Sequence, residues 1–205
     1  MTRRAVIVGG LTAALGACAP LGGGPQQTFR LGGEDAGAAA RLPDRPAARR
    51  PVVAVERPLA TGAMNTDRLV VEIGAELQFV SGARWEDAMP DLVALRAAEA
   101  LQRTGAVDVV DGAQRAGRAN YALVTVLRRM QVAIADDLSG DAVTEIAARL
   151  VTLPGRDVAA TASFTGRAQA RDDAPATLVA AMERSTAEAL GDLAAWTAAQ
   201  TAPTG

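Results

Sequence analysis

The stretch that decides the fold is "YALVTVLRRMQVAI", residues 121–134, the first of three long segments rich in Val, Leu, Ile and Ala. The other two are "AVTEIAARLVTL" (142–153) and "RDVAATASFTGRAQA" (156–170). The short segments "ADDLSGD" and "LPGRD", which are typical of turns, separate the three. Segments of this composition between turn residues are typical of β-strands. We therefore expect three long strands joined by turns.

Side chains alternate along the third of these segments. One face receives Val158, Ala160, Ala162, Phe164 and Ala168. The other face receives Asp157, Thr161, Ser163, Thr165 and Arg167. Because successive side chains of a strand point to opposite faces, one side of the sheet is expected to meet the core and the other to meet water or a partner.

Shorter strands are predicted in the first half of the chain. "PVVAVERP" (51–58) is an apolar run closed by prolines, and its second proline suits a sheet edge or a strand end. "DRLVVEI" (67–73) and "AELQFV" (75–80) flank Gly74 and predict a pair of strands. "AVDVV" (106–110) predicts one more.

Two helices are predicted. The first covers 86–105, with Glu86 or Asp87 as its cap, Pro90 in its first turn and Gly105 at its end. Its expected buried stripe is Met89, Leu92 or Val93, Ala97 and Leu101. The second runs from about Pro175 to Thr197, with a buried stripe of Leu178, Met182, Ser185, Ala189, Leu193 and Trp196.

These elements predict a single α+β domain at 51–198, with an antiparallel or mixed β-sheet and two principal helices packed on one face. The preceding segment, 18–50, is expected to be a tether and linker, in which "QTFRL" (27–31) is a candidate short strand. Residues 199–205 are expected to form a disordered tail.

The N-terminal stretch "LTAALGACAPLGGG" (11–24) contains the only cysteine of the chain, Cys18. Arg3 and Arg4 precede a short apolar run from Ala5 to Ala17 that ends in small residues, which is the layout of a secretory signal peptide. The run is shorter than the roughly 20 apolar residues of a membrane-spanning helix. Residues 1–17 are therefore predicted to be a signal peptide.

Leu15, Gly16, Ala17 and Cys18 resemble a bacterial lipobox. The resemblance implies cleavage between Ala17 and Cys18, a diacylglyceryl group on the Cys18 thiol, and acylation of the new amino terminus. Such chains would anchor the protein stably. By the same resemblance, Ala19 favours the outer membrane. The alternative is an ordinary signal peptide that ends by chance in a cysteine.

Composition excludes several kinds of active site. The chain has no histidine, and all 21 of its basic residues are arginine. It therefore lacks Ser-His-Asp and histidine-metal sites, a Schiff-base lysine and a lysine phosphate loop. The net charge of −2 leaves no general basic surface for nucleic acid, and we expect no cofactor or metal beyond the lipid on Cys18. The aspartates of "ADDLSGD" lack the spacing of an EF-hand and are better interpreted as a hairpin turn.

A family resemblance rests on four features that occur in order. They are the lipobox at Cys18, "FRL" (29–31) in place of the usual Tyr-x-Leu, "SGARWEDAMPDLVALRAAEAL" (81–101) and "ANYALVTVLRRM" (119–130). Together they resemble the ABC-type transport auxiliary lipoproteins, which include the paraquat-inducible protein C type. That family works beside mammalian-cell-entry (MCE) domain proteins and an ABC transporter that move lipids or other hydrophobic molecules between two membranes.

Trp85, at the junction between a strand and a helix, is the candidate site residue. An indole at this position is most simply interpreted as core packing. The alternative is a partner contact that it forms together with Leu77 and Phe79, because aromatic residues are enriched at interface hot spots.

The sequence thus favours a non-enzymatic outer membrane lipoprotein that docks an MCE assembly at the membrane. Its expected partners are the MCE-domain protein and the ABC transporter that works with that protein. Whether the lipoprotein forms a homo-oligomer is left open. The alternative is a stand-alone envelope lipoprotein that binds peptidoglycan or other envelope proteins. A carboxylate-based hydrolase would require paired acids that converge in a cleft.

Overall fold

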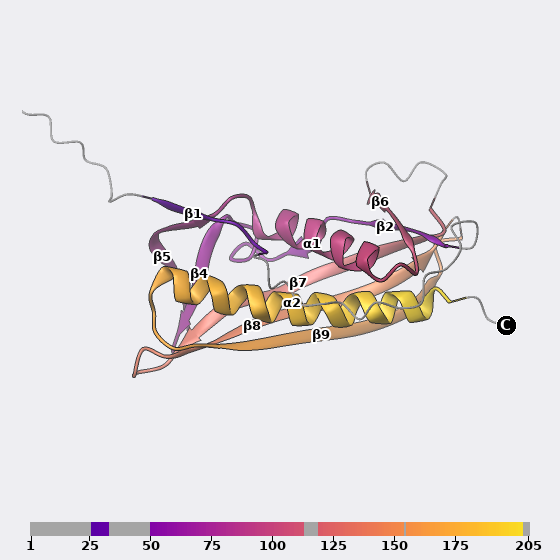
Figure 1. The fold of residues 1–205 in the computed structure, drawn as a ribbon. Helices are drawn as coiled ribbons and strands as arrows, with labels where there is room; N and C mark the ends of the chain where they lie inside the picture. Colours follow the sequence, from indigo (N-terminus) through magenta and orange to yellow (C-terminus); the bar gives the residue numbers. More distant parts are fainter. Residues whose placement is uncertain (1–25, 33–49, 113–118, 154, 203–205) are drawn as a thin grey trace, which may run out of the picture.

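The computed structural model describes residues 26–32, 50–112, 119–153 and 155–202. Within these ranges the chain forms nine strands of one sheet and two helices (Figure 1). The strands are β1 (Gln27–Phe29), β2 (Val52–Val55), β3 (Leu59–Ala60), β4 (Arg68–Ile73), β5 (Glu76–Trp85), β6 (Asp108–Asp111), β7 (Tyr121–Ile134), β8 (Gly140–Thr152) and β9 (Val158–Ala170). The helices are α1 (Met89–Arg103) and α2 (Pro175–Gln200).

The long strand β7 organises the sheet. On one edge it pairs antiparallel with β8, which pairs antiparallel with β9. Its other edge receives β2, β3 and β4 one after another, all parallel to it. The sheet then continues from β4 to β5 and β1, and from β2 to β6. The sheet is therefore mixed, and the predicted α+β class and the three long strands are confirmed.

The two-residue strand β3 was not predicted, because so short a segment has no periodicity to detect. Of the two positions predicted for Pro58, a sheet edge or a strand end, the structure confirms the strand end. Pro58 follows β2, which pairs with β6 and β7 and is not an edge strand.

The alternation predicted for β9 is confirmed from Ala160 onward but not at Val158, which is 55% exposed. The register shifts at this point, because Ala160 pairs with Leu150 while Val158 pairs with the adjacent Val151. The extra residue on β9 is a bulge, which puts the residue before it out of phase with the rest of the strand.

Helix α1 has the predicted stripe and end but a different start. Met89, Leu92, Val93, Ala97 and Leu101 are buried, and Gly105 follows the C-cap with a φ of 67°. The predicted caps are wrong, because the N-cap is Ala88 and no side chain caps the helix. Asp87 instead accepts a hydrogen bond from the amide of Ala88 at 2.7 Å. Pro90 accounts for the missing cap in part, since a proline in the first turn has no N–H to satisfy.

Helix α2 extends beyond its expected end at Thr197 and reaches Gln200. Thr197 and Thr201 are buried, and their hydroxyls donate to the carbonyls of Leu193 and Ala198. Residues 199–202 of the predicted disordered tail are therefore a helix end and a turn, whereas 203–205 lie outside the described residues.

Both helices lie on the same side of the sheet (Figure 1). α2 packs along β8 and β9, and α1 packs beside α2 and against β2 and β6. The approach is close at Gly166 of β9, where an added Cβ would lie 1.8 Å from the carbonyl oxygen of Ser185. A glycine is required there, because any side chain would push the helix off the sheet. In the described part of the chain no helix is long and apolar enough to cross a membrane.

Candidate partner surface

Strand β5 contains all three predicted site residues, but it places them in two environments. Leu77 and Phe79 are 47% and 41% exposed, whereas Trp85 is fully buried. Leu77 and Phe79 share one face of the β4–β5 hairpin, because they are two residues apart and pair with Glu72 and Val70. The structure therefore brings Leu77 and Phe79 together on the surface and separates Trp85 from them.

The ring of Phe79 is held by a cation. The guanidinium carbon of Arg68 lies 4.3 Å from the centroid of the Phe79 ring. A cation over an aromatic face stabilises a pair by about 0.5–1 kcal/mol at exposed sites. The exposed ring is therefore presented in a defined position.

The same stretch of β5 is a sheet edge. β1 pairs with β5 only at Ala83, Arg84 and Trp85. Among the described residues, 76–79 therefore pair with β4 on one side alone, and a register shift separates them from Arg84, the next residue that pairs with β4. An edge strand with exposed large hydrophobic side chains is prone to pair with another chain, which natural proteins normally prevent. This edge is the strongest candidate for a docking surface in the described part of the molecule.

Trp85 belongs to the junction between sheet and helix. It lies in register with Phe29 of β1, and its backbone amide donates to the carbonyl of Asp67 at 2.6 Å. Its indole Nε1 has no hydrogen-bond partner among the described residues. With no exposed surface in this structure, Trp85 packs in the core.

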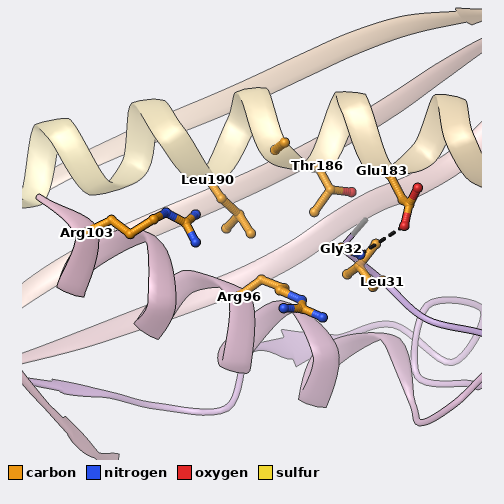
Figure 2. A pocket seen from close by; sticks show the side chains of 8 residues that line it. Leu31, Gly32, Arg96, Arg103, Glu183, Thr186 and Leu190 are labelled. Atoms are coloured by element: carbon orange, nitrogen blue, oxygen red, sulfur yellow. Dashed lines mark hydrogen bonds between the residues drawn. The ribbon is translucent and has the colours of Figure 1, made fainter. Parts of the chain in front are cut away.

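Leu31 is a core residue that sequence reasoning did not single out. It is 1% exposed, and the amide of the following Gly32 donates to Glu183 Oε1 of α2 at 3.0 Å (Figure 2). Figure 2 shows Leu31 and Gly32 beside α1 and α2. The only sequence signal for the burial of Leu31 was its apolar side chain in the "FRL" triplet, within a stretch rich in Gly and Pro.

The space between these segments is small. The cavity measures about 20 Å³, which holds about one water molecule. Its walls are Leu31, Gly32, Arg96, Arg103, Glu183, Thr186, Ala187 and Leu190. The region is therefore a packing junction and not a ligand pocket.

Charged side chains form local pairs. Arg128 and Arg129 donate to the two carboxylate oxygens of Glu145, which lowers the pKa of Glu145. The hydrogen bond from Arg57 to Asp91 raises the pKa of Arg57, although partial burial opposes the shift. Neither of these two ion pairs brings together the two carboxylic acids that a carboxylate-based hydrolase would require in a cleft.

The segment "ADDLSGD" forms the turn between β7 and β8. The amide and hydroxyl of Ser139 both donate to Asp137 Oδ1, at 3.0 and 2.6 Å, and these bonds lower the pKa of Asp137. Within the described ranges no cluster of three or more acidic, histidine or cysteine side chains is arranged to hold a metal ion. The signal peptide and the lipobox residues Leu15, Gly16, Ala17 and Cys18 lie outside the described residues.

The described part of the chain is thus an α+β domain with an exposed sheet edge. Residues 33–194 match the family described as the ABC-type transport auxiliary lipoprotein component. The chain belongs to this family. No protein with a curated description matches it.

Solved structures share the fold. Protein XCC0632 from Xanthomonas campestris, of the family DUF330, gives a TM-score of 0.71 at 22% identity and covers 85% of this chain and 95% of its own. An uncharacterised protein gives a TM-score of 0.61 at 12% identity, over 85% of this chain and 99% of its own. The hypothetical protein CT253 from Chlamydia trachomatis gives a TM-score of 0.53 at 7% identity, over 74% of this chain and 98% of its own. At these identities the likeness concerns the fold alone.

Proposed function

We propose that the protein is a non-enzymatic outer membrane lipoprotein that docks an MCE assembly at the membrane, within an ABC-type system that moves lipids or other hydrophobic molecules. Membership of the family of ABC-type transport auxiliary lipoproteins is the observation that carries this proposal. Lipidation of Cys18, cleavage after Ala17 and the outer membrane location indicated by Ala19 are parts of the same proposal.

The exposed edge of β5 supports a docking role. Leu77 and Phe79 present apolar side chains beside backbone groups that pair with β4 alone among the described residues. A partner can add a strand to this edge, and its backbone then pairs with these backbone groups of β5. Pockets on the same partner can bury the side chains of Leu77 and Phe79. We therefore assign this edge to the MCE protein, with Trp85 supporting it from the core.

Affinity purification of the tagged, lipidated protein from detergent-solubilised envelopes tests the proposal. The expected result is recovery of an MCE-domain protein, identified by mass spectrometry, and its loss from the variant Leu77→Ser/Phe79→Ser. Leu95→Ser is the matched control, because Leu95 is 52% exposed on α1, away from β5. Recovery of peptidoglycan-linked proteins alone would favour the stand-alone envelope lipoprotein.

Anchoring is tested separately with Cys18→Ser. This variant is expected to leave the membrane fraction or to remain unprocessed, because the thiol that takes the diacylglyceryl group is gone. Unchanged outer membrane fractionation would contradict lipidation at Cys18.

A further inference from the structure

We infer that the end of the sheet formed by the β4–β5 turn and the β7–β8 turn rests on the phospholipid surface, through Ile73 and Leu138. The inference rests on the proposed lipidation of Cys18. It goes beyond that proposal by fixing which end of the domain faces the bilayer and which side chains touch it.

The two turns lie at the same end of the sheet. Ile73, the last residue of β4, is in register with Ile134, the last residue of β7. The turn of residues 135–139 follows Ile134 directly, and the amide of Ala135 donates to the carbonyl of Ser139 at 2.8 Å. A single surface laid across this end of the sheet would therefore meet both turns.

Both turns expose a large aliphatic side chain. Ile73 is 46% exposed and Leu138 is 53% exposed. Leu138 also has a φ of 65°, in the left-handed region that favours Gly or Asn. A leucine there costs backbone energy and gains little packing within the domain, which points to a contact outside the domain.

β1 enters the sheet from the side of this end. It is parallel to β5, and its first residue, Gln27, lies opposite Ala83. Along β5, Glu76 and the β4–β5 turn lie on the N-terminal side of Ala83, which is also the side on which β1 begins.

The length of the N-terminal segment fits this direction. Seven residue steps of β5 separate Ala83 from Glu76, which is at most about 23 Å along a strand. Nine peptide steps separate Cys18 from Gln27 and span at most about 30 Å. An anchor at Cys18 can therefore sit in a bilayer that the turns touch.

The charges at this end select the kind of lipid surface. The carboxylates on or beside the two turns are Glu72, Glu76, Asp136, Asp137 and Asp141. One cation, Arg171 after the end of β9, lines the same hollow as Ser139 and Asp141. Because the carboxylates outnumber this arginine, this end is repelled by anionic headgroups and is compatible with a zwitterionic surface that offers ammonium groups. We therefore assign the contact to zwitterionic phospholipid, and expect anionic lipid to weaken it.

The test uses single cysteines in the lipidated chain, because an acylated Cys18 has no free thiol. Ile73→Cys and Leu138→Cys are labelled with a polarity-sensitive dye and reconstituted in vesicles of phosphatidylethanolamine and phosphatidylcholine. Val158→Cys is the matched control, since Val158 is equally exposed at the other end of β9, about 40 Å from Ala170 along the strand. Quenching by lipids with spin labels near the headgroup is measured.

The expected result is a loss of emission at positions 73 and 138, no loss at 158, and a smaller loss when phosphatidylglycerol replaces the neutral lipid. An unquenched dye at either 73 or 138, in protein that floats with the vesicles, overturns the inference alone. If the chain without an introduced cysteine takes the dye at Cys18, the anchor is absent, and both the anchoring and this inference fall.

Discussion

The backbone amide of Gly32 donates a hydrogen bond to the carboxylate of Glu183 at 3.0 Å, and so joins the N-terminal segment to the last helix across 151 residues of sequence. Leu31 is buried immediately before this bond, and β1 adds to the sheet before Leu31. Three successive interactions therefore fix residues 27–32 to the rest of the domain.

Leu31→Ala is expected to lower the free energy of unfolding by about 2–5 kcal/mol, because it leaves a cavity in the core. Urea unfolding followed by circular dichroism measures the change. Leu59→Ala is the control, since Leu59 is 61% exposed and its loss should cost little. Equal effects of the two substitutions would show that the N-terminal segment does not stabilise the domain.

Two glycines should respond to alanine with opposite signs. Gly166→Ala should destabilise the fold by about 1–3 kcal/mol or more, because the new methyl group would collide with the backbone of Ser185. Gly191→Ala should stabilise it by up to about 1 kcal/mol, because Gly191 lies within α2 and an added Cβ meets no atom within 4 Å. Thermal unfolding of the two variants measures both signs, and a neutral Gly166→Ala would contradict the close packing of α2 on β9.

The carboxylate of Glu145 should make stability depend on acid pH. Its pKa is lowered from the ordinary value of 4.5, chiefly by hydrogen bonds from Arg128 and Arg129. Its contribution is therefore complete above pH 4.5 and disappears as the pH falls through the lower folded-state pKa. We expect Glu145→Gln to destabilise the protein by about 0.5–1 kcal/mol at neutral pH.

The pH series separates this effect from a general loss of stability. Below the folded-state pKa of Glu145, wild type and Glu145→Gln should unfold at nearly the same urea concentration. A difference that stays constant from neutral pH into acid would mean that the two arginines do not stabilise the charged carboxylate.

Trp85→Ala is expected to lower the free energy of unfolding by about 3–5 kcal/mol, because it removes a fully buried indole. Trp85→Phe should cost much less, since the indole Nε1 makes no hydrogen bond to the described residues. Chemical unfolding of both variants gives the comparison. A Trp85→Ala protein that keeps wild-type stability and yet loses its partner would contradict core packing and favour a direct contact.

The elements with strong local periodicity could be predicted from the sequence. Met89, Val93, Ala97 and Leu101 recur at helical spacing, and the segment of β7 is long and apolar, so neighbouring residues alone define both elements. The parallel placement of β2, β3 and β4 along β7 could not be predicted, because parallel pairing joins segments that are distant in sequence and leaves no local pattern. The burial of Leu31 depends in the same way on helices that come much later in the chain.

The candidate surface was predictable only in part. The alternation along β5 places Leu77 and Phe79 on one face, but it does not tell whether another element covers that face. Only the structure shows that Leu77 and Phe79 remain 47% and 41% exposed among the described residues. The exposure of Leu138 likewise follows from the turn conformation and not from residue type.

Photo-crosslinking at β5 in living cells tests the central claim most directly, because it identifies what touches the proposed docking edge. A photoreactive amino acid replaces Phe79, and a matched variant carries it at Leu95 on α1. The account predicts a crosslink to an MCE-domain protein from position 79 and none from position 95. Crosslinks from position 79 to peptidoglycan-linked or unrelated envelope proteins only, in cells that contain the MCE protein, would contradict it.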